Sequence, residues 1–421
     1  MRRASYWAYW MVVVLVAGVS GYAQETVGTS TPLSALLAEA QAKNPDIAAA
    51  EHATRAAAQV ARQKATLPDP MVTVQSFSVG SPKPFAGFSN SNFAYLGFGA
   101  SQEIPYAGKL RLRGEVADRA AGTEQARAEL LRTSIAEQVK LAYLKLAYLQ
   151  ATLTILERED GLLRPLIETG LSRYSVGEGS QAEVLKAQME HTKFVREVTM
   201  HHEEMGQLQA ELKELLHRPQ ESADITPVEL TATPLDRTAE ELRAMVAGSN
   251  PAVGVENAAL QQQDAARRSA EREGRPDFNV GYMFQQTGAA YSDYYMLTLS
   301  MRVPRRRRVE AGVAETTEHW ESAKQTLDSE VQGQVAEVQK EYVAATSTAE
   351  LLKEYREGLV PQAQAAFGAE QTTYASGKGT FDRVLASLLD VLTFEKDYQQ
   401  TLLDHETALA HLETLTGAQL R

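Results

Sequence analysis

The sequence predicts a mostly helical protein with a smaller β part, built as two tandem structural repeats. Three observations lead to this fold class. Short motifs return after roughly two hundred residues, a period too long for a solenoid unit. Long segments carry heptad patterns of apolar residues, which are typical of helices that pack side by side. Two pairs of short segments alternate apolar and polar residues, as strands with two different faces do.

The repeated motifs place the same elements in the same order in residues 24–230 and 231–421. In each half a helix leads into two strands, a very long helix, a Gly-rich turn and a returning helix. The Asn-Pro pairs predict helix starts, and the later prolines predict the ends of the same helices. The motif pairs are Asn44-Pro45 with Asn250-Pro251, Leu67-Pro68-Asp69 with Arg275-Pro276-Asp277, and Tyr174 to Gly179 with Tyr374 to Gly379.

The N-terminus predicts export. Arg2 and Arg3 precede an apolar run, and small residues lead up to Ala23, which is the pattern of a secretory signal peptide over residues 1–23. The alternative is an uncleaved inner-membrane anchor, since Tyr6 to Ala23 nearly reaches the ~20 apolar residues that span a bilayer. The chain has no cysteine, so it can carry neither a disulfide nor a lipid-modified N-terminal cysteine.

Composition narrows the function classes. The formal net charge is −12, and an acidic balance argues against nucleic acid as a partner, because phosphate binding needs a surplus of Lys and Arg. Charged residues interrupt every apolar run after Ala23, so no later segment is expected to cross a membrane as a helix. If the mature chain enters a membrane, it must do so as strands closed into a barrel.

A heptad seam predicts one very long helix in each repeat, over about residues 109–175 and 308–375. At ~1.5 Å per residue the first would be roughly 100 Å long, more than the width of any compact domain. Shorter helices are expected at 44–67 and 180–218, and at 250–274 and 380–416. Each pair of shorter helices nearly matches its long helix in total length. This equality predicts a wall in which one full helix lies beside two stacked half-helices.

Each repeat has two strand candidates between the first half-helix and the long helix. They lie at about 71–80 and 93–104, and at 277–286 and 294–303. One face of these segments is apolar and aromatic and the other is mostly polar or small, and strands of ~9–11 residues with this alternation fit a membrane barrel. Soluble hairpins with one buried face are the alternative. Recurrence of the insertion in both halves of an exported chain favours the barrel.

Four strands cannot close a barrel, and an open edge is not tolerated in lipid. Several chains must therefore share one barrel. Two chains would give eight strands and a filled interior, whereas three would give twelve strands and a lumen. The helices of three chains could then form a tube below it, with polar residues facing water inside. Such an object is a duct from the periplasm across the outer membrane.

Enzyme and metal motifs fail, so no catalytic residue and no cofactor is expected. The segment from Gly377 to Thr380 lacks the earlier glycine of a phosphate loop and the hydroxyl residue directly after its lysine. The pairs His202-Glu203 and His405-Glu406 lack a second histidine four positions on. A cluster of Met200, His201, His202 and Met205 could interest a soft metal, but adjacent histidines point to different helix faces, and no bound metal is expected.

The sharpest run of positive charge is Arg305 to Arg308. It follows the last strand and would lie at the periplasmic rim of the barrel, where Lys109, Arg111 and Arg113 fall in the first repeat. Anionic lipid headgroups are one possible partner. The simpler interpretation is a solvated rim that keeps the chain from slipping into the bilayer.

Several segments together resemble the TolC family of outer membrane efflux proteins. They are the Asn44-Pro45 opening, the Pro68-Asp69 strand entry, the segment SQEIPYAGKLRLRGEVA from Ser101 and the turn RYSVGEGSQAEVLKA from Arg173. The resemblance covers almost the whole mature chain, and the order of the parts is specific because few proteins alternate them twice. It implies a homotrimer with a twelve-strand outer-membrane β-barrel, a periplasmic α-barrel and an equatorial belt built from Pro32 to Lys43 and Pro219 to Gly248.

The resemblance also implies partners and a location. Family members accept substrate from an inner-membrane pump and a periplasmic adaptor protein and release it outside. The segment around Ser101 is most like members paired with RND-type pumps, including heavy-metal exporters. The expected location is the outer membrane of a Gram-negative-type bacterium, in contact with its lipid and with a large periplasmic portion.

In the family, the Gly-rich turns form a periplasmic tip that docks the adaptor and narrows to a gate. Carried over by position, Tyr374 and Asp382 are gate candidates, with Tyr174 and Glu183 as first-repeat counterparts. Gly379 stands where the family pattern leads us to expect a basic gate residue, and Lys378 is the neighbouring candidate for that role. The candidate tip residues are Tyr174, Gly177, Gly179, Glu183, Tyr374, Gly377, Lys378, Gly379 and Asp382.

Two other classes of function compete with the duct. A periplasmic adaptor also carries a helical hairpin, but its β-rich modules flank a single hairpin rather than being inserted twice. A structural coiled-coil protein of the envelope would need no amphipathic strands.

Overall fold

The computed structural model describes residues 30–78, 83, 94–287 and 292–420. The first repeat contains α1 (Leu33–Lys43), α2 (Pro45–Ala65), β1 (Met71–Phe77), β2 (Tyr95–Ile104), α3 (Lys109–Ser175) and α4 (Gln181–Leu215). The second contains α5 (Ala239–Ser249), α6 (Pro251–Glu273), β3 (Asp277–Thr287), β4 (Tyr294–Arg302), α7 (Arg306–Glu354), a π-helical turn (Tyr355–Leu359), α8 (Val360–Ala375) and α9 (Phe381–Thr416). The proposed signal peptide and strand residues 79, 80 and 93 lie outside the described residues.

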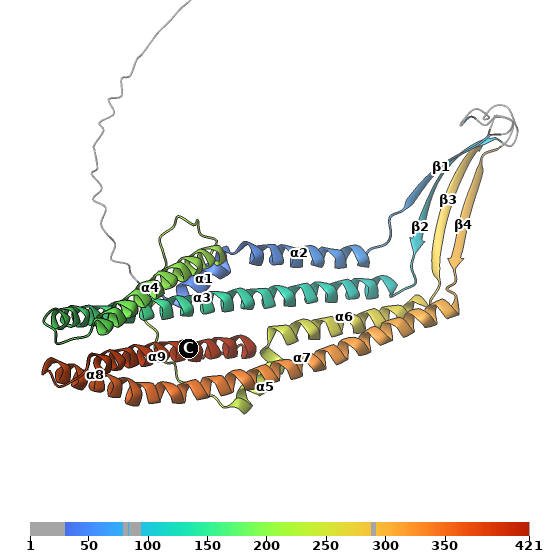
Figure 1. Cartoon of the computed structure of the whole chain (residues 1–421). Helices are drawn as coiled ribbons and strands as arrows, with labels where there is room; N and C mark the ends of the chain where they lie inside the picture. Colours follow the sequence, from blue (N-terminus) through green and yellow to red (C-terminus); the bar gives the residue numbers. More distant parts are fainter. Residues whose placement is uncertain (1–29, 79–82, 84–93, 288–291, 421) are drawn as a thin grey trace, which may run out of the picture.

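The molecule is elongated, with the sheet at one end and two helical hairpin turns at the other (Figure 1). The long helices run between these ends, and the four strands continue beyond them as one antiparallel sheet. The predicted fold class, mostly helical with a four-stranded β part, is confirmed.

Half-helices flank each long helix, as Figure 1 shows. Beside the 67 residues of α3 lie α2 with 21 and α4 with 35, placed end to end along it. In the second repeat α6 with 23 residues and α9 with 36 take the same places. The Asn44 and Asn250 side chains each accept hydrogen bonds from two backbone N–H groups of the following turn, so both Asn-Pro pairs act as helix caps.

The second long helix is not continuous, contrary to the expectation for residues 308–375. A π-helical turn at Tyr355–Leu359 separates α7 from α8. Pro361 lies just beyond this turn and has no N–H to donate, and its ring clashes with the carbonyl four residues earlier in a regular helix. Widening the preceding turn relieves that clash, so the proline accounts for the interruption.

The four strands form one sheet in the order β1-β2-β3-β4. The β2–β3 pair joins the two repeats, while β1 and β4 form the outer edges. Register keeps the faces apart: Phe98 opposes Phe284 and Val74 opposes Phe98 on the apolar face. On the other face Ser300 opposes Asn279. Every residue of β4 is exposed in the single chain.

The repeats pack together through α3, which contacts both α6 and α9 of the second repeat. Lys140 of α3 forms an ion pair with Glu413 of α9 at 2.6 Å. Glu137 Oε1 lies 2.6 Å from His411 Nδ1, and this hydrogen bond to a carboxylate raises the pKa of His411. Polar contacts therefore fix how the two hairpins sit against each other.

One stretch of α3 is long and apolar enough to cross a membrane, alone among the helices of the described residues. Lys140 and Lys145 interrupt the apolar part of α3, as expected, but the stretch is still apolar enough overall to qualify. However, 67% of its residues are buried inside the protein, against the neighbouring helices. It is therefore the central core helix, as the burial of Leu146, Leu149 and Leu156 at 0% exposure shows.

The equatorial region is held by side chains from distant segments. The guanidinium of Arg218, just after α4, makes two hydrogen bonds to the Glu39 carboxylate of α1. These hydrogen bonds from Arg218 lower the pKa of Glu39 to about 2, and Lys43 adds to the effect. Tyr143 of α3 links the segments that precede α1 and α5, since its hydroxyl donates to Thr31 O and accepts from Val228 N.

Lys109, where the sheet meets the helices, is buried rather than part of a solvated rim, so that interpretation was wrong for this residue. The side chain of Lys109 is only 1% exposed and its Nζ lies 2.9 Å from Asp277 Oδ1 and 3.3 Å from Glu273 Oε2. Arg113 also pairs with Glu273, at 2.7 Å. The backbone N–H of Tyr106 donates to Asp277 at 2.9 Å. Lys109 and Arg113 therefore bind the second repeat to the first, whereas Arg111 and the Arg305 to Arg308 run are exposed in the single chain.

Candidate functional site

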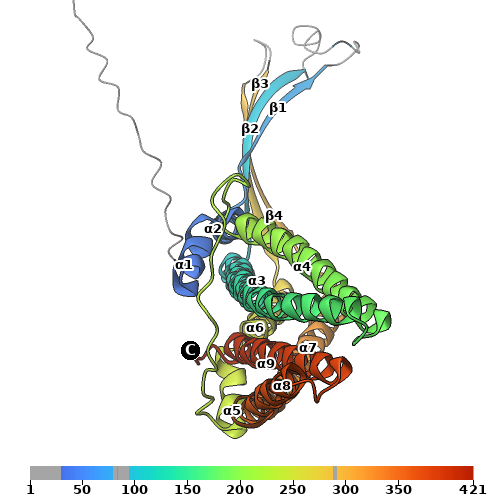
Figure 2. The same cartoon turned by 60° about the vertical axis from the view of Figure 1, so that its left-hand side comes forward.

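The two hairpin turns lie next to each other at the end of the molecule opposite the sheet (Figures 1 and 2). Each turn ends its helix in the same way. The N–H of Gly177 donates to Tyr174 O and that of Glu178 to Arg173 O, while Gly377 and Lys378 repeat both bonds in the second turn. This is a Schellman motif, and it needs the positive φ values of 78° and 75° that Gly177 and Gly377 adopt.

The second glycine of each turn is required for space. A Cβ on Gly379 would lie 2.9 Å from the backbone nitrogen of Tyr374, and one on Gly179 would lie 3.1 Å from that of Tyr174. At Gly179 and Gly379 the backbone of the turn lies so close to the end of the preceding helix that a side chain would crowd it. The four tip glycines are thus explained by turn geometry alone.

The returning helices are capped differently. Ser180 and Glu183 form a capping box at the start of α4, because Ser180 accepts from the first-turn backbone and Glu183 accepts from the Ser180 N–H. Thr380 makes no side-chain cap hydrogen bond at the start of α9, where Asp382 stands in the first turn. Glu183 therefore has a local structural role that Asp382 does not share.

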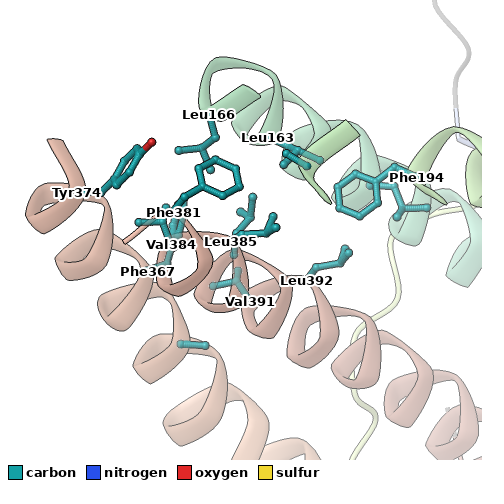
Figure 3. Close-up of a cluster of buried hydrophobic side chains, with 14 of the residues drawn as sticks. Leu163, Leu166, Phe194, Phe367, Tyr374, Phe381, Val384, Leu385, Val391 and Leu392 are labelled. Atoms are coloured by element: carbon teal, nitrogen blue, oxygen red, sulfur yellow. The ribbon is translucent and has the colours of Figure 1, made fainter. Parts of the chain in front are cut away.

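Tyr374 is held in an aromatic and cationic environment. It is 6% exposed, and its ring meets the ring of Phe381 edge-on at 6.0 Å. The guanidinium of Arg173, from the other hairpin, lies 4.9 Å from the Tyr374 ring centroid. Figure 3 shows Phe381 reaching from α9 toward Leu166 of α3, at the end of the largest hydrophobic cluster. The second tip is therefore packed onto the first.

Tyr174 is not held in this way. It is 46% exposed, and the residue that corresponds to Phe381 in its own hairpin is Gln181, which is exposed. The two tyrosines occupy equivalent positions in the Schellman turns, yet only Tyr374 has an aromatic partner. The tips are alike in backbone and different in side-chain packing.

One ion pair joins the two tips, and another lies within the second hairpin. Lys186 of α4 lies 3.0 Å from Asp382 of α9, and both side chains are more than half exposed. Arg383 pairs with Glu370 of α8 at 2.6 Å. Within the described residues Lys378 has no ion-pair partner and is exposed at the apex of its turn. These exposed pairs contribute little to stability on their own, but they fix the positions of the charged side chains at the hairpin tips.

Comparison with known proteins gives a family match for part of the chain and a shared fold for nearly all of it. Residues 36–216, which include α3, the first tip and α4, match the sequence model of the family described as outer membrane efflux protein. Solved structures share the fold of nearly the whole chain. The outer-membrane channel OprN has a TM-score of 0.78 at 16% identity, covering 92% of this chain and 90% of its own. The chain therefore contains a segment that matches the outer membrane efflux protein family, within a fold that these channels share.

Two further structures have the same fold. VceC from Vibrio cholerae has a TM-score of 0.76 at 16% identity, covering 92% of this chain and 97% of its own. The MtrE outer membrane channel of Neisseria gonorrhoeae, in its open state, has a TM-score of 0.75 at 16% identity, covering 92% and 89%. No curated protein sequence matches the chain significantly.

The predicted tip residues lie together in the structure, with one correction. Glu183 is not the counterpart of Asp382. Counting from Gly179 and Gly379, the residue equivalent to Glu183 is Arg383, and the residue equivalent to Asp382 is Ala182. The partners that matter to Tyr374 and Asp382 are Arg173, Phe381 and Lys186, which the sequence did not point out because each contact crosses between distant helices.

Two of the histidines noted in the sequence, His405 and His201, are largely buried among the helices. His405 is 1% exposed, and its two ring nitrogens lie 3.0 Å from Ala345 O and 2.8 Å from Thr233 O. Burial lowers the pKa of His201, whose side chain is 14% exposed. Among the described residues, no three His, Asp or Glu side chains gather in a way that could hold a metal ion.

Proposed function

We propose that this protein is the exit duct of a tripartite efflux system, conducting substrate passively from the periplasm to the exterior. The observation that carries the proposal is the sheet: four strands with an exposed apolar face and two open edges, set at the end of a helical part whose longest helix, α3, is roughly 100 Å long. Val72, Val74, Leu297 and Leu299 of that face are each at least 59% exposed in the single chain. Outer-membrane lipid is the environment that suits such a surface.

A homotrimer follows from the edges. Open strand edges in lipid leave backbone groups unsatisfied, so the sheet must be closed by other copies. Three chains give twelve strands and leave a lumen, lined by the face that carries Thr73, Gln75, Thr298 and Ser300. The family match of residues 36–216 and the OprN-like fold support this assembly.

The partners proposed are a periplasmic adaptor at the tips and an inner-membrane pump, of RND type by the resemblance around Ser101. An adaptor that meets helical hairpins end-on would contact the exposed turn residues, which include Tyr174, Val176 and Lys378. The mature chain would lose its signal peptide and stay in the outer membrane, with the α-helical part in the periplasm.

The test is membrane fractionation together with the native mass of the detergent-extracted protein. We expect a processed chain in the outer-membrane fraction with the mass of three chains. A soluble or inner-membrane monomer would overturn the proposal and favour a periplasmic adaptor. A lumen is checked separately by single-channel conductance in planar bilayers, since a structural coiled-coil protein of the envelope would give none.

Within the duct we propose that Asp382 forms an acidic ring at the periplasmic entrance and binds cations there. In the chain its charge is shared with Lys186 at 3.0 Å. Asp382→Asn should weaken block of conductance by divalent cations about tenfold, because the ring loses three charges. Lys186→Gln should strengthen the block, because it leaves Asp382 unpaired.

Asp390→Asn is the matched control for Asp382. It makes the same change on an exposed residue of the same helix, two turns farther from the tip, and should leave the block unchanged. An unchanged block in Asp382→Asn, or an equal loss in Asp390→Asn, would remove Asp382 from the gate without affecting the duct itself.

A further inference from the structure

The junction between β2 and β3 shows how two neighbouring repeats are joined at the base of the sheet. Asp277, at the start of β3, accepts from the N–H of Tyr106 at 2.9 Å and pairs with Lys109, which follows β2, at 2.9 Å. The lysine is buried and the aspartate side chain is only 10% exposed. The junction therefore consists of one strand-entry aspartate and one cation from the start of the adjacent long helix.

The β1–β2 and β3–β4 hairpins have the same register, so each residue of one hairpin has a definite counterpart in the other. Met71 pairs with Ser101 in the first hairpin, and Asn279 pairs with Ser300 in the second. Counting back two residues from the first members gives Asp69 and Asp277. Counting forward eight from the second members gives Lys109 and Arg308. The turns that precede these cations also agree: Lys109 N donates to Tyr106 O and Arg308 N to Arg305 O, both at 3.0 Å.

Both counterparts, Asp69 and Arg308, lie at the open edges of the sheet. Asp69 precedes β1 and Arg308 follows β4, and each of these strands has one neighbour within the chain. Both residues are exposed, and neither has an ion-pair partner within the described part of the chain. The single chain thus carries one complete junction and, at its two edges, the two halves of another, with opposite charges.

We propose that Arg308 of one subunit pairs with Asp69 of the next, and that β4 pairs with β1 of the neighbouring copy in the register of the internal junction. This inference rests on the proposed homotrimer and specifies how it closes. Transferring the β2–β3 register, in which Ser101 opposes Gly281 and Ala100 opposes Tyr282, sets Ser300 opposite Thr73 and Leu299 opposite Val74 of the neighbour. Polar residues then meet on one face and apolar residues on the other, as a closed barrel in lipid requires.

The junction between subunits is expected to be simpler than the one within a chain. The second ion pair of the internal junction joins Glu273 to Arg113 at 2.7 Å. By the same count, the residues in these two places at the outer edges are Ala65 and Gly312. The junction between subunits therefore lacks both residues of this second ion pair, so neither leaves an unpaired charge. The pair of Arg308 and Asp69 remains to set the register.

Disulfide cross-linking tests the register directly, because the chain has no cysteine of its own. Thr73→Cys combined with Ser300→Cys should give covalent dimers and trimers on oxidation of the purified trimer. Phe77→Cys with Ser300→Cys is the control: both residues lie on the same face but four positions out of register, and it should not cross-link. Cross-linking of the control pair with none of the Thr73 pair would overturn the proposed register.

Charge exchange tests the ion pair. Asp69→Arg and Arg308→Asp should each lower the temperature at which trimers dissociate in detergent, and the double variant should recover it. Asp69→Arg with Arg307→Asp makes the same charge change one residue away and should not recover it. If the double variant does not recover the dissociation temperature while its trimers still form and cross-link, the ion pair is refuted but the register is not. Absence of any trimer in the unmodified protein would instead refute the homotrimer on which the inference rests.

Discussion

Asp277→Ala is expected to destabilise the protein by about 3–5 kcal/mol, the cost of removing one partner from a buried ion pair. Lys109 is 1% exposed, and the variant removes the carboxylate nearest to its buried ammonium group. Glu273, 3.3 Å from Lys109 but 40% exposed, can compensate only in part. The Tyr106 N–H also loses its acceptor. The measurement is thermal unfolding of the purified protein in detergent, together with the fraction of chains that reach the trimer.

A second variant separates charge from packing. Lys109→Met combined with Asp277→Asn removes both charges while keeping the side-chain volume and an acceptor for Tyr106, and it should recover most of the lost stability. Asp46→Ala, an exposed aspartate in the first turn of α2, is the control for loss of an aspartate elsewhere and should cost no more than about 1 kcal/mol. If Asp277→Ala is no worse than this control, the pair does not hold the repeats together.

Most helices and strands of this fold can be predicted from local sequence patterns. Heptad seams mark long helices because one face of each must pack against a neighbour, and period-two alternation marks strands because the sheet has two different faces. The structure places α3 at Lys109–Ser175 and the Asn-Pro caps at Asn44 and Asn250. The π-helical turn was not foreseen, since a proline inside a helical pattern can equally kink, end or widen the helix.

The side-chain chemistry of the tip was only partly predictable, because it depends on which helices meet. Glycine positions follow from backbone geometry within six residues, so Gly177 and Gly377 could be assigned from the sequence. The partners of Tyr374 come from another hairpin and from the far side of the turn, and no local pattern links Arg173 to it. Lys109 was misjudged for the same reason, since a lysine in a basic segment gives no sign of a buried carboxylate 168 residues away.

Phe381→Ala is expected to release the second tip from the first. Phe381 is 1% exposed, lies within 3.7 Å of the position a Gly170 Cβ would take and packs on Tyr374, so truncation removes the contacts that join α9 to α3 near the turn. Deleting a buried phenyl ring costs about 3–5 kcal/mol. The measurement is amide hydrogen exchange, in which protection of the last turns of α8 and first turns of α9 should fall at least about hundredfold.

The first hairpin supplies the matched control, because Gln181 occupies the position of Phe381 and is exposed. Gln181→Ala should change exchange at neither tip. Phe381→Gln gives the second hairpin the chemistry of the first, and should expose Tyr374 as Tyr174 is exposed while leaving the Schellman turn at Gly377 intact. If the gate is the packed second tip, Phe381→Gln also raises single-channel conductance. Raised exchange without raised conductance would make Phe381 a structural anchor only, and unchanged exchange would mean that Tyr374 and Arg173 hold the tip without it.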